Sequence, residues 1–356
     1  MINGNKEFID IIIDEKFRAE VFEYMKTNLY IQSYEVQRNI PILYKYRTLS
    51  RYSVDDIIKS QFMASSISSF NDIFDGTIQA YGNIEQRKVY AQSDFDELRM
   101  HLQKCGIKGP NESFINIMEE YYKQESLNLF DMLDYVHTYV FCLSETNDST
   151  LMWAHYANEN TGICIEYDFN KIDESTLINK SIFPVAYSSQ PIDVLPLIGE
   201  KPSVKVLYPY DAAILCAALN KADVWEYEKE WRFVEIDVKR NVLRITKESV
   251  KPNRIIFGNR FLKPLFYFTD NADEKKRCLE HFEVLYDLLE FMIREGIMAA
   301  VVLPEIGSFR LSLRNLPADR LKSFINNYIQ DKCEDIRLYK HINNSLIDFI
   351  DVNEIR

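Results

Sequence analysis

The sequence predicts an α+β fold in which a central region with a mixed or antiparallel sheet carries helical additions. Short segments of alternating apolar and polar residues, typical of strands, recur between residues 41 and 262. Apolar residues at three- and four-residue spacing, typical of helices, dominate on either side and again at about 80–134. We therefore predict a helical N-terminal extension over 1–40, an α+β core over 41–262 with a helical insertion at about 80–134, and a mainly helical C-terminal extension over 263–356.

Individual elements follow from the same patterns. The predicted strands are 42–47, 62–67, 139–144, 162–167, 183–187, 242–245, 254–258 and 298–303. The predicted helices are 5–38, a short helix capped by Ser53, a helix capped by Ser149 that runs to Ala157, and 211–222. Proline residues separate several of these segments, and we detect no internal repeat.

The composition narrows the class of protein. Hydrophobic residues make up 47% and charged residues 27% of the 356, which suffices for a sizeable core. The net charge of −12 gives no long-range attraction for nucleic acid, and the 10 glycines form no phosphate-binding loop. The six cysteines are dispersed, which favours buried reduced thiols over a disulfide or metal framework. No segment resembles a signal peptide or a membrane span, so we predict a cytoplasmic protein without membrane contact.

Four clusters of polar, aromatic and acidic residues between Leu43 and Glu235 are candidates for chemistry. In the first, Tyr44 and Tyr46 project to one side of a strand while Lys45 and Arg47 project to the other. Two cations beside buried rings suit a phosphate or diphosphate ligand. The alternative is an edge strand with a solvated basic face.

The second cluster follows a strand and contains Ser65, Ser66, Asn71, Asp72 and Asp75. Its hydroxyls and short acids suit the rim of a cleft at a strand end. The alternative is structural, because Asn and Asp after a strand commonly build an Asx-turn by accepting from their own backbone.

The third cluster joins Ser144 to a helix with Trp153, His155 and Tyr156. His155 and Tyr156 fall on one helix face with Met152, where a lone His is more often structural than catalytic. Without a second His or Cys at ligand spacing, zinc is not indicated. A Ser/His/Asp triad drawn from this cluster lacks a nucleophile elbow.

The fourth cluster is the segment WEYEKEWRF. On a strand, Glu226, Glu228, Glu230 and Arg232 would share one face, and aligned carboxylates raise at least one pKa unless a cation offsets them. The available cations are Arg232, Lys45 and Arg47. Trp and Tyr neighbours indicate that this strand is covered, which favours a functional interpretation over a solvated acidic edge strand.

In this order the clusters resemble a widespread bacterial family known only as a domain of unknown function. The resemblance spans roughly 43–260 without the insertion and is carried by the segments LYKYRTL, SSISSFNDIFDG, FCLSETNDSTLMWAHYANENTGICIEYDF, K…WEYEKEWRF and RIIFGNR. The pattern also resembles divergent ADP-ribosyltransferases, which implies their split-sheet fold and NAD as substrate. In that superfamily a first strand holds NAD, a middle strand bears a hydroxyl or ring, and a later strand bears a catalytic Glu, often as Glu-x-Glu.

This resemblance implies that Glu230 stabilises the cationic ribose and that Glu228 orients the acceptor. The implied NAD-binding residues are Tyr44, Lys45, Tyr46, Arg47, Ser65, Ser66, Asn71, Asp72, Ser144, Trp153, His155, Tyr156 and Arg232. The helical additions in turn fit a regulated toxin or phage-defence effector that modifies a protein or nucleic acid and has a regulatory or antitoxin partner.

Two other functions fit the same residues. Asp72, Asp75, Glu228 and Glu230 could gather magnesium for a metal-dependent nuclease or phosphodiesterase. The same cleft could instead belong to a non-catalytic module that senses a nucleotide or binds a partner protein. The acids form no established two-metal motif, which favours ADP-ribosyl transfer over the first of these.

Overall fold

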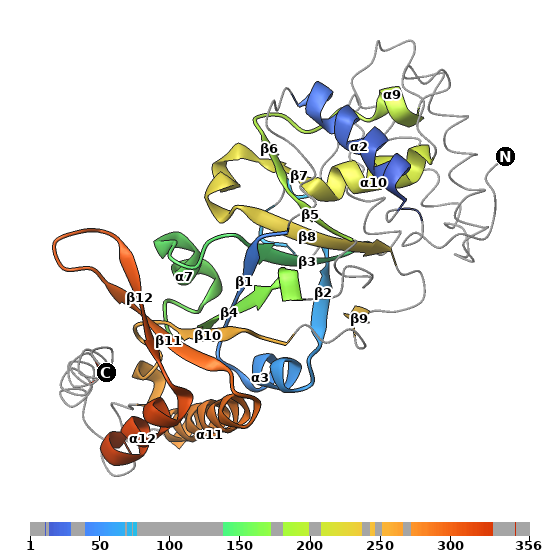
Figure 1. The fold of residues 1–356 in the computed structure, drawn as a ribbon. Coiled ribbons are helices and arrows are strands. Elements are labelled where there is room, and N and C mark those ends of the chain that lie inside the picture. Colours follow the sequence, from blue (N-terminus) through green and yellow to red (C-terminus); the bar gives the residue numbers. More distant parts are fainter. Residues whose placement is uncertain are drawn as a thin grey trace. The chain divides into compact units, whose positions relative to one another are not determined.

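The fold is known from a computed structural model, drawn in Figure 1. It describes residues 11, 14–29, 40–67, 70–72, 74–76, 138–171, 181–198, 208–236, 243–245, 251–265, 272–329 and 346. The chain forms two compact units, each assembled from three segments. Unit 1 comprises Met1–Arg38, Met63–Cys142 and Glu174–Ile245, and unit 2 comprises Asn39–Phe62, Leu143–Asp173 and Thr246–Arg356.

Unit 2 is built around a mixed sheet. Its strands are β1 (Ile42–Arg47), β4 (Ile163–Asp168), β10 (Arg254–Phe257), β11 (Met298–Pro304) and β12 (Leu311–Leu316). They lie in the order β12-β11-β10-β4-β1, and all neighbours are antiparallel except β10 and β11. A parallel pair needs a crossover, which helix α11 (Ala272–Glu295) supplies.

The helices of unit 2 begin at defined capping residues or cover the sheet. They are α3 (Arg51–Ile58), α7 (Thr150–Tyr156), α11 and α12 (Ala318–Ile329), with short 3-10 turns at Phe169–Lys171 and Lys263–Leu265. Ser149 caps α7, as predicted, by accepting from the backbone N–H of Met152 at 3.3 Å. The cap of α3 is Ser50 and not Ser53, because the Ser50 hydroxyl accepts from the Ser53 N–H. Helix α11 packs against both α3 and α12.

Unit 1 combines a second group of strands with helices. Its strands are β2 (Phe62–Ser66), β3 (Thr138–Ser144), β5 (Ile182–Pro184), β6 (Ala186–Ser188), β7 (Asn220–Ala222), β8 (Glu230–Ile236) and β9 (Leu243–Ile245). The unit boundary falls within β2 and β3. The pairing order is β9-β2-β3-β8-β5, while β6 and β7 form a separate parallel pair.

The helices of unit 1 are α2 (Glu15–Asn28), α9 (Leu195–Ile198), α10 (Pro209–Leu219) and the 3-10 turn η3 (Asp223–Glu228). Residues 211–219 of α10 are all buried, as expected for a helix that is apolar on every side. It contacts α2, α9 and β8, so it forms the core of the unit.

The predicted mixed α+β character is confirmed, with four differences in detail. The single strand predicted at 183–187 is two strands, because Val185 donates to the carbonyl of Glu230 and β6 then pairs with β7. The helix predicted at 211–222 ends at Leu219, where β7 begins. Strand β12 was not predicted. Helix α2 occupies only part of the predicted 5–38 helix; residues 1–10, 12–13 and 30–39 and the predicted insertion at about 80–134 lie outside the described residues.

Candidate functional site

The predicted acidic segment does not form one strand. Residues Asp223–Glu228 form the 3-10 turn η3, Lys229 is left-handed with φ of 44°, and strand β8 starts at Glu230. Glu226 consequently lies on the exposed side of the turn, so the predicted alignment of three carboxylates on one strand face is wrong. The reversal at Lys229 nevertheless brings Glu228 and Glu230 to the same place.

Five charged side chains of unit 1 meet there in a buried charge cluster. Its members are Asp75, Lys221, Glu228, Glu230 and Arg232, of which none is more than 6% exposed. The Lys221 ammonium group is central: it donates to the Glu228 carboxylate and, at 3.0 Å, to Oε2 of Glu230. It also lies 3.8 Å from Oδ2 of Asp75. The Glu-x-Glu segment is therefore organised by a lysine from β7.

Arg232 forms the other half of the charge cluster. Its guanidinium group binds both oxygens of Asp75, at 2.6 and 2.7 Å, in the bidentate geometry that is strongest for this pair. It also donates to Oε2 of Glu230 at 2.9 Å and to the Ala218 carbonyl at 2.7 Å. Arg232 is completely buried, and its guanidinium lies 5.4 Å from the centroid of the Phe70 ring. This network fixes the position of the Glu230 carboxylate.

The electrostatics of the charge cluster favour an ionised Glu230. Burial alone would raise its pKa, but Arg232 and Lys221 outweigh burial and lower the pKa to about 2. Burial likewise opposes the charged form of Lys221, and Glu230 and Glu228 outweigh it, so the Lys221 pKa is raised. A raised carboxylate pKa was expected unless a cation offsets the repulsion, and at Glu230 two cations, Arg232 and Lys221, do so.

Aromatic side chains border the charge cluster. Tyr187 lies opposite Lys221 in the parallel β6–β7 pair, and its hydroxyl oxygen accepts from the backbone N–H of Glu230 at 2.8 Å. Burial, and then Glu230, raise the pKa of Tyr187, so its hydroxyl stays protonated at neutral pH. Trp225 and Tyr227 are half-buried and form a tilted ring pair 6.0 Å apart, and the Lys221 ammonium lies 5.2 Å from the Trp225 ring.

The sequence interpretation gave no role to Lys221 or Tyr187, and it considered Asp75 only for the rim of a cleft or as a magnesium ligand. Lys221 follows a long apolar helix and precedes the acidic segment by a few residues. This local context could have predicted that its side chain is buried. Lys221 reaches Glu228 and Glu230 because its strand, β7, pairs with β6. The paired residues Tyr187 and Lys221 lie far apart along the chain. No local pattern encodes that pairing.

The predicted residues of the second cluster lie at the end of β2 and in the turn after it, also in unit 1. Asp72 is buried, and its Oδ1 accepts from the backbone N–H of Phe74 at 3.0 Å. This is the Asx-turn that the structural alternative predicted. The turn presents Asp75 to Arg232. Asn71 and Ser65 are exposed and Ser66 is half-buried.

The predicted first-strand residues belong to unit 2. As the alternation predicted, Tyr44 and Tyr46 are buried while Lys45 and Arg47 are half-buried. The Arg47 guanidinium binds Asp56 of α3 at 2.9 Å. The Tyr46 hydroxyl donates to the Thr146 carbonyl at 2.9 Å. In unit 2, Arg47 and Tyr46 thus tie β1 to neighbouring segments.

The third predicted cluster is also part of unit 2. Trp153 is completely buried, donates from its indole N–H to the Asn147 carbonyl at 2.8 Å, and packs edge-on against Tyr46. Ser144 is buried and accepts from the Thr146 N–H, whereas His155 is exposed and Tyr156 half-buried. The predicted residues are thus divided: Glu228, Glu230 and Arg232 come together in unit 1, and the first and third clusters lie in unit 2.

A second buried ion pair lies in unit 2, within the segments GICIEYDF and RIIFGNR. Glu166 of β4 is 2% exposed and binds Arg254 of β10, and it also accepts from the Asn253 side chain at 2.5 Å. Gly258 follows β10 so closely packed that an added Cβ would lie 2.2 Å from the Asn160 carbonyl oxygen. These parts of the recognised pattern serve the β4–β10 contact.

Asp211, in the first turn of α10, is a buried acid outside the charge cluster. Burial raises its pKa from 3.8 to about 6. Because the folded pKa exceeds the unfolded one, the folded state is favoured below pH 3.8 and progressively disfavoured up to about pH 6. We expect Asp211→Asn to increase the free energy of unfolding by roughly 1–3 kcal/mol at pH 7 and by little near pH 4.

Urea denaturation at the two pH values would measure this effect. Asp223→Asn, which alters an exposed acid in η3, is the matched control and should change stability by less than about 0.5 kcal/mol. An equal effect of Asp211→Asn at both pH values would show that the Asp211 charge is not the cause.

The described residues contain neither a metal site nor a membrane-spanning helix. Among them, no three His, Cys, Asp or Glu side chains are placed to hold a metal ion. No helix in the described part of the chain has the length and apolar character needed to cross a membrane.

Comparison of this α+β chain with known proteins gives one family match, which covers part of the buried charge cluster. Residues 152–233 match the family described as protein of unknown function (DUF2971), which confirms the predicted relationship to an uncharacterised domain family. The matched range contains Lys221, Glu228, Glu230 and Arg232, while Asp75 lies before it. No curated protein and no solved structure matches the chain.

Proposed function

We propose that this protein consumes NAD as an ADP-ribosyltransferase-like enzyme, with Glu230 and Glu228 as its catalytic residues. One observation carries the proposal: both carboxylates of the Glu-x-Glu segment bind the Lys221 ammonium group. Glu230, the first residue of β8, has a carboxylate pKa lowered to about 2. An ionised carboxylate at the start of a later strand fits what the resemblance to ADP-ribosyltransferases implies.

The chemistry follows from these groups. The bond between C1′ of the ribose and the nicotinamide nitrogen breaks, and nicotinamide leaves as a neutral molecule with the bonding electrons. The ribose then carries oxocarbenium character, which the ionised Glu230 stabilises. A nucleophile of the acceptor forms the new bond to C1′, and Glu228 orients it and accepts its proton.

Other groups have supporting roles. Lys221 and Arg232 are positioning residues, because they hold Glu230 ionised and in place. The half-buried Trp225 and Tyr227 offer ring faces on which nicotinamide can stack.

We propose a protein or nucleic acid as the acceptor, in a toxin or phage-defence effector controlled by a regulatory partner. The test is nicotinamide release from NAD by the full chain, measured by liquid chromatography with protein, RNA and DNA acceptors. Release that depends on one acceptor supports transfer, and release without any acceptor supports NAD hydrolysis. If no nicotinamide forms and NAD does not bind in calorimetry, the proposed function is wrong.

A further inference from the structure

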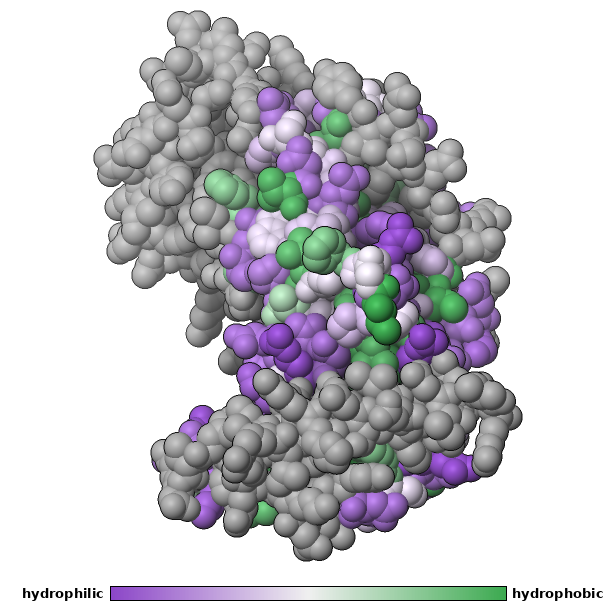
Figure 2. All heavy atoms as spheres, turned by 90° about the vertical axis from the view of Figure 1, so that its left-hand side faces the viewer, coloured by the Kyte–Doolittle hydropathy of each residue, from purple (hydrophilic) through white to green (hydrophobic). Residues whose placement is uncertain are grey.

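The hairpin between β11 and β12 exposes two large apolar side chains. Ile306 and Phe309 are 105% and 104% exposed, more than any other large apolar residue of the described chain. The loop that joins the two strands extends away from the sheet of unit 2 (Figure 1). The face turned to the viewer in Figure 2 shows apolar residues exposed among hydrophilic ones. Single exposed apolar residues are ordinary, but two at one turn indicate a contact surface.

The turn that carries them is held by hydrogen bonds. The Glu305 N–H donates to the Arg310 carbonyl at 2.9 Å, and the Ser308 hydroxyl donates to the Glu305 carboxylate at 2.9 Å. Gly307 provides the left-handed conformation, with φ of 81°, that the turn requires. The hairpin tip, residues 305–310, therefore presents its apolar side chains without the entropic cost of ordering a flexible loop.

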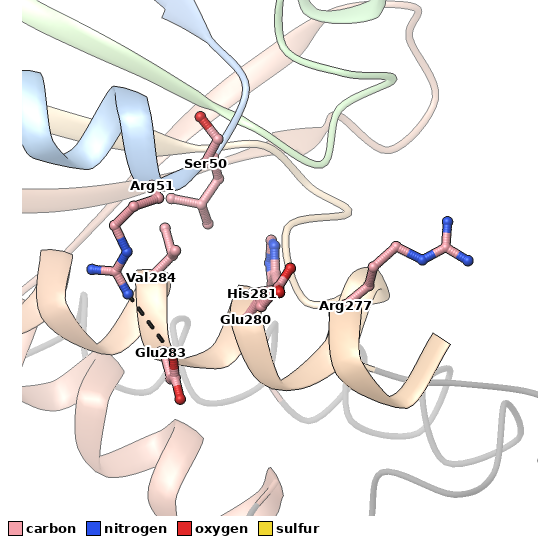
Figure 3. A pocket seen from close by; sticks show the side chains of 8 residues that line it. Ser50, Arg51, Arg277, Glu280, His281, Glu283 and Val284 are labelled. Carbon is pink, nitrogen blue, oxygen red and sulfur yellow. Dashed lines mark ion pairs between the residues drawn. The ribbon is translucent and has the colours of Figure 1, made fainter. Parts of the chain in front are cut away.

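The same unit contains a pocket that suits such a tip. It has a volume of about 510 Å³ and lies between the start of α3 and helix α11 (Figure 3). Leu49 and Val284 provide apolar walls, and the α11 side of the rim carries Arg277, Glu280 and Glu283. The rim acids are weakly held, since Glu280 lies 3.9 Å from Lys276 and Glu283 lies 4.0 Å from Arg51.

We propose that the hairpin tip of one molecule inserts into this pocket of a second copy, and that the exchange is reciprocal in a twofold dimer. The charges are complementary: Arg310 of the tip would meet Glu280, and Glu305 would meet Arg277. The volume accommodates the side chains of Phe309 and Ile306. Each copy carries both the tip and the pocket within one unit, so a twofold dimer would form the contact twice.

The buried area sets the expected strength. A Phe side chain alone buries about 150–250 Å², so two tips, two pockets and their rims approach the roughly 1,200 Å² of small specific interfaces. We therefore expect a concentration-dependent dimer with a dissociation constant in the micromolar range.

Sedimentation velocity of the full chain across micromolar concentrations tests the proposal. The wild type should dimerise, and Ile306→Ser/Phe309→Ser should raise the dissociation constant at least about thirtyfold. Both side chains are fully exposed, so this variant should fold normally. Leu279→Ser, which removes a 64% exposed apolar residue of α11 outside the pocket lining, is the matched control and should dimerise like the wild type.

A charge exchange tests the pocket itself. Arg310→Glu should weaken the dimer, and adding Glu280→Arg to it should restore wild-type association. A monomeric wild type, a dimer that survives the Ser substitutions, or a lack of restoration would each overturn the proposal. So would a monomer that binds phosphatidylcholine–phosphatidylglycerol vesicles through Phe309, because the tip would then serve a membrane surface.

Discussion

Glu230→Gln is expected to lower nicotinamide release from NAD at least about a hundredfold, because the neutral amide cannot stabilise the cationic ribose. The substitution keeps the size and one hydrogen-bonding oxygen of the side chain. Glu230 is ionised across the neutral range, since its pKa is about 2, so the loss should be the same at every pH at which the enzyme works. Nicotinamide release at saturating NAD would measure it.

Glu230→Gln should also lower the stability of the protein through the charge cluster. Glu230 binds Lys221 and Arg232, so Glu230→Gln also removes one carboxylate from two buried cations and should lower stability. Unlike the substitution of a surface carboxylate, Glu230→Gln is therefore expected to change the stability of the folded state. Activity must be measured well below the unfolding temperature of each variant, with the folded fraction checked by circular dichroism.

Glu226→Gln is the matched control, because Glu226 belongs to the same acidic segment but is exposed on η3. It should retain both activity and stability. Wild-type turnover in Glu230→Gln would show that Glu230 takes no part in the reaction, even if the protein consumes NAD. Equal losses in the two variants would point to a general effect of charge.

Local patterns in the sequence predicted most elements but not how their side chains combine. Strands β1 and β4 and helix α7 followed from alternation or from a capping serine, which are properties of neighbouring residues. Strand β12 escaped because Leu311–Arg314 are all half-buried, so no apolar face stands out. The exposure of Glu226 depends on the left-handed Lys229, a conformation that the residue type does not signal.

The candidate site shows the same limit. Its carboxylates were recognised because Glu-x-Glu is a local motif, and their cations were sought in Arg232, Lys45 and Arg47. Arg232 does bind Glu230, but the second cation of the cluster is Lys221, which reaches Glu228 and Glu230 through η3 and the β6–β7 pair. Long-range pairing of this kind is outside the reach of a single sequence.

The other large effect is expected for Arg232→Met, which should lower the free energy of unfolding by about 3–5 kcal/mol. Arg232 is completely buried and binds Asp75, Glu230 and the Ala218 carbonyl. Methionine fills much of the same volume, so the loss comes mainly from Asp75 and Glu230, which stay buried with one cation, Lys221, instead of two. Urea denaturation at pH 7 would measure it, with the 65% exposed Arg294→Met as a control within about 0.5 kcal/mol of the wild type.

A double-mutant cycle separates this electrostatic cause from lost packing. Asp75→Leu alone should destabilise the protein because Arg232 loses its bidentate partner, at 2.6 and 2.7 Å. The combined Asp75→Leu/Arg232→Met variant removes both charges, so it should be more stable than the two separate losses predict, by about 2 kcal/mol. Simple additivity would show that the pair contributes no coupling and that Arg232 acts through its volume. Full coupling would establish the Asp75–Arg232 ion pair as a structural support of the charge cluster that contains Glu230.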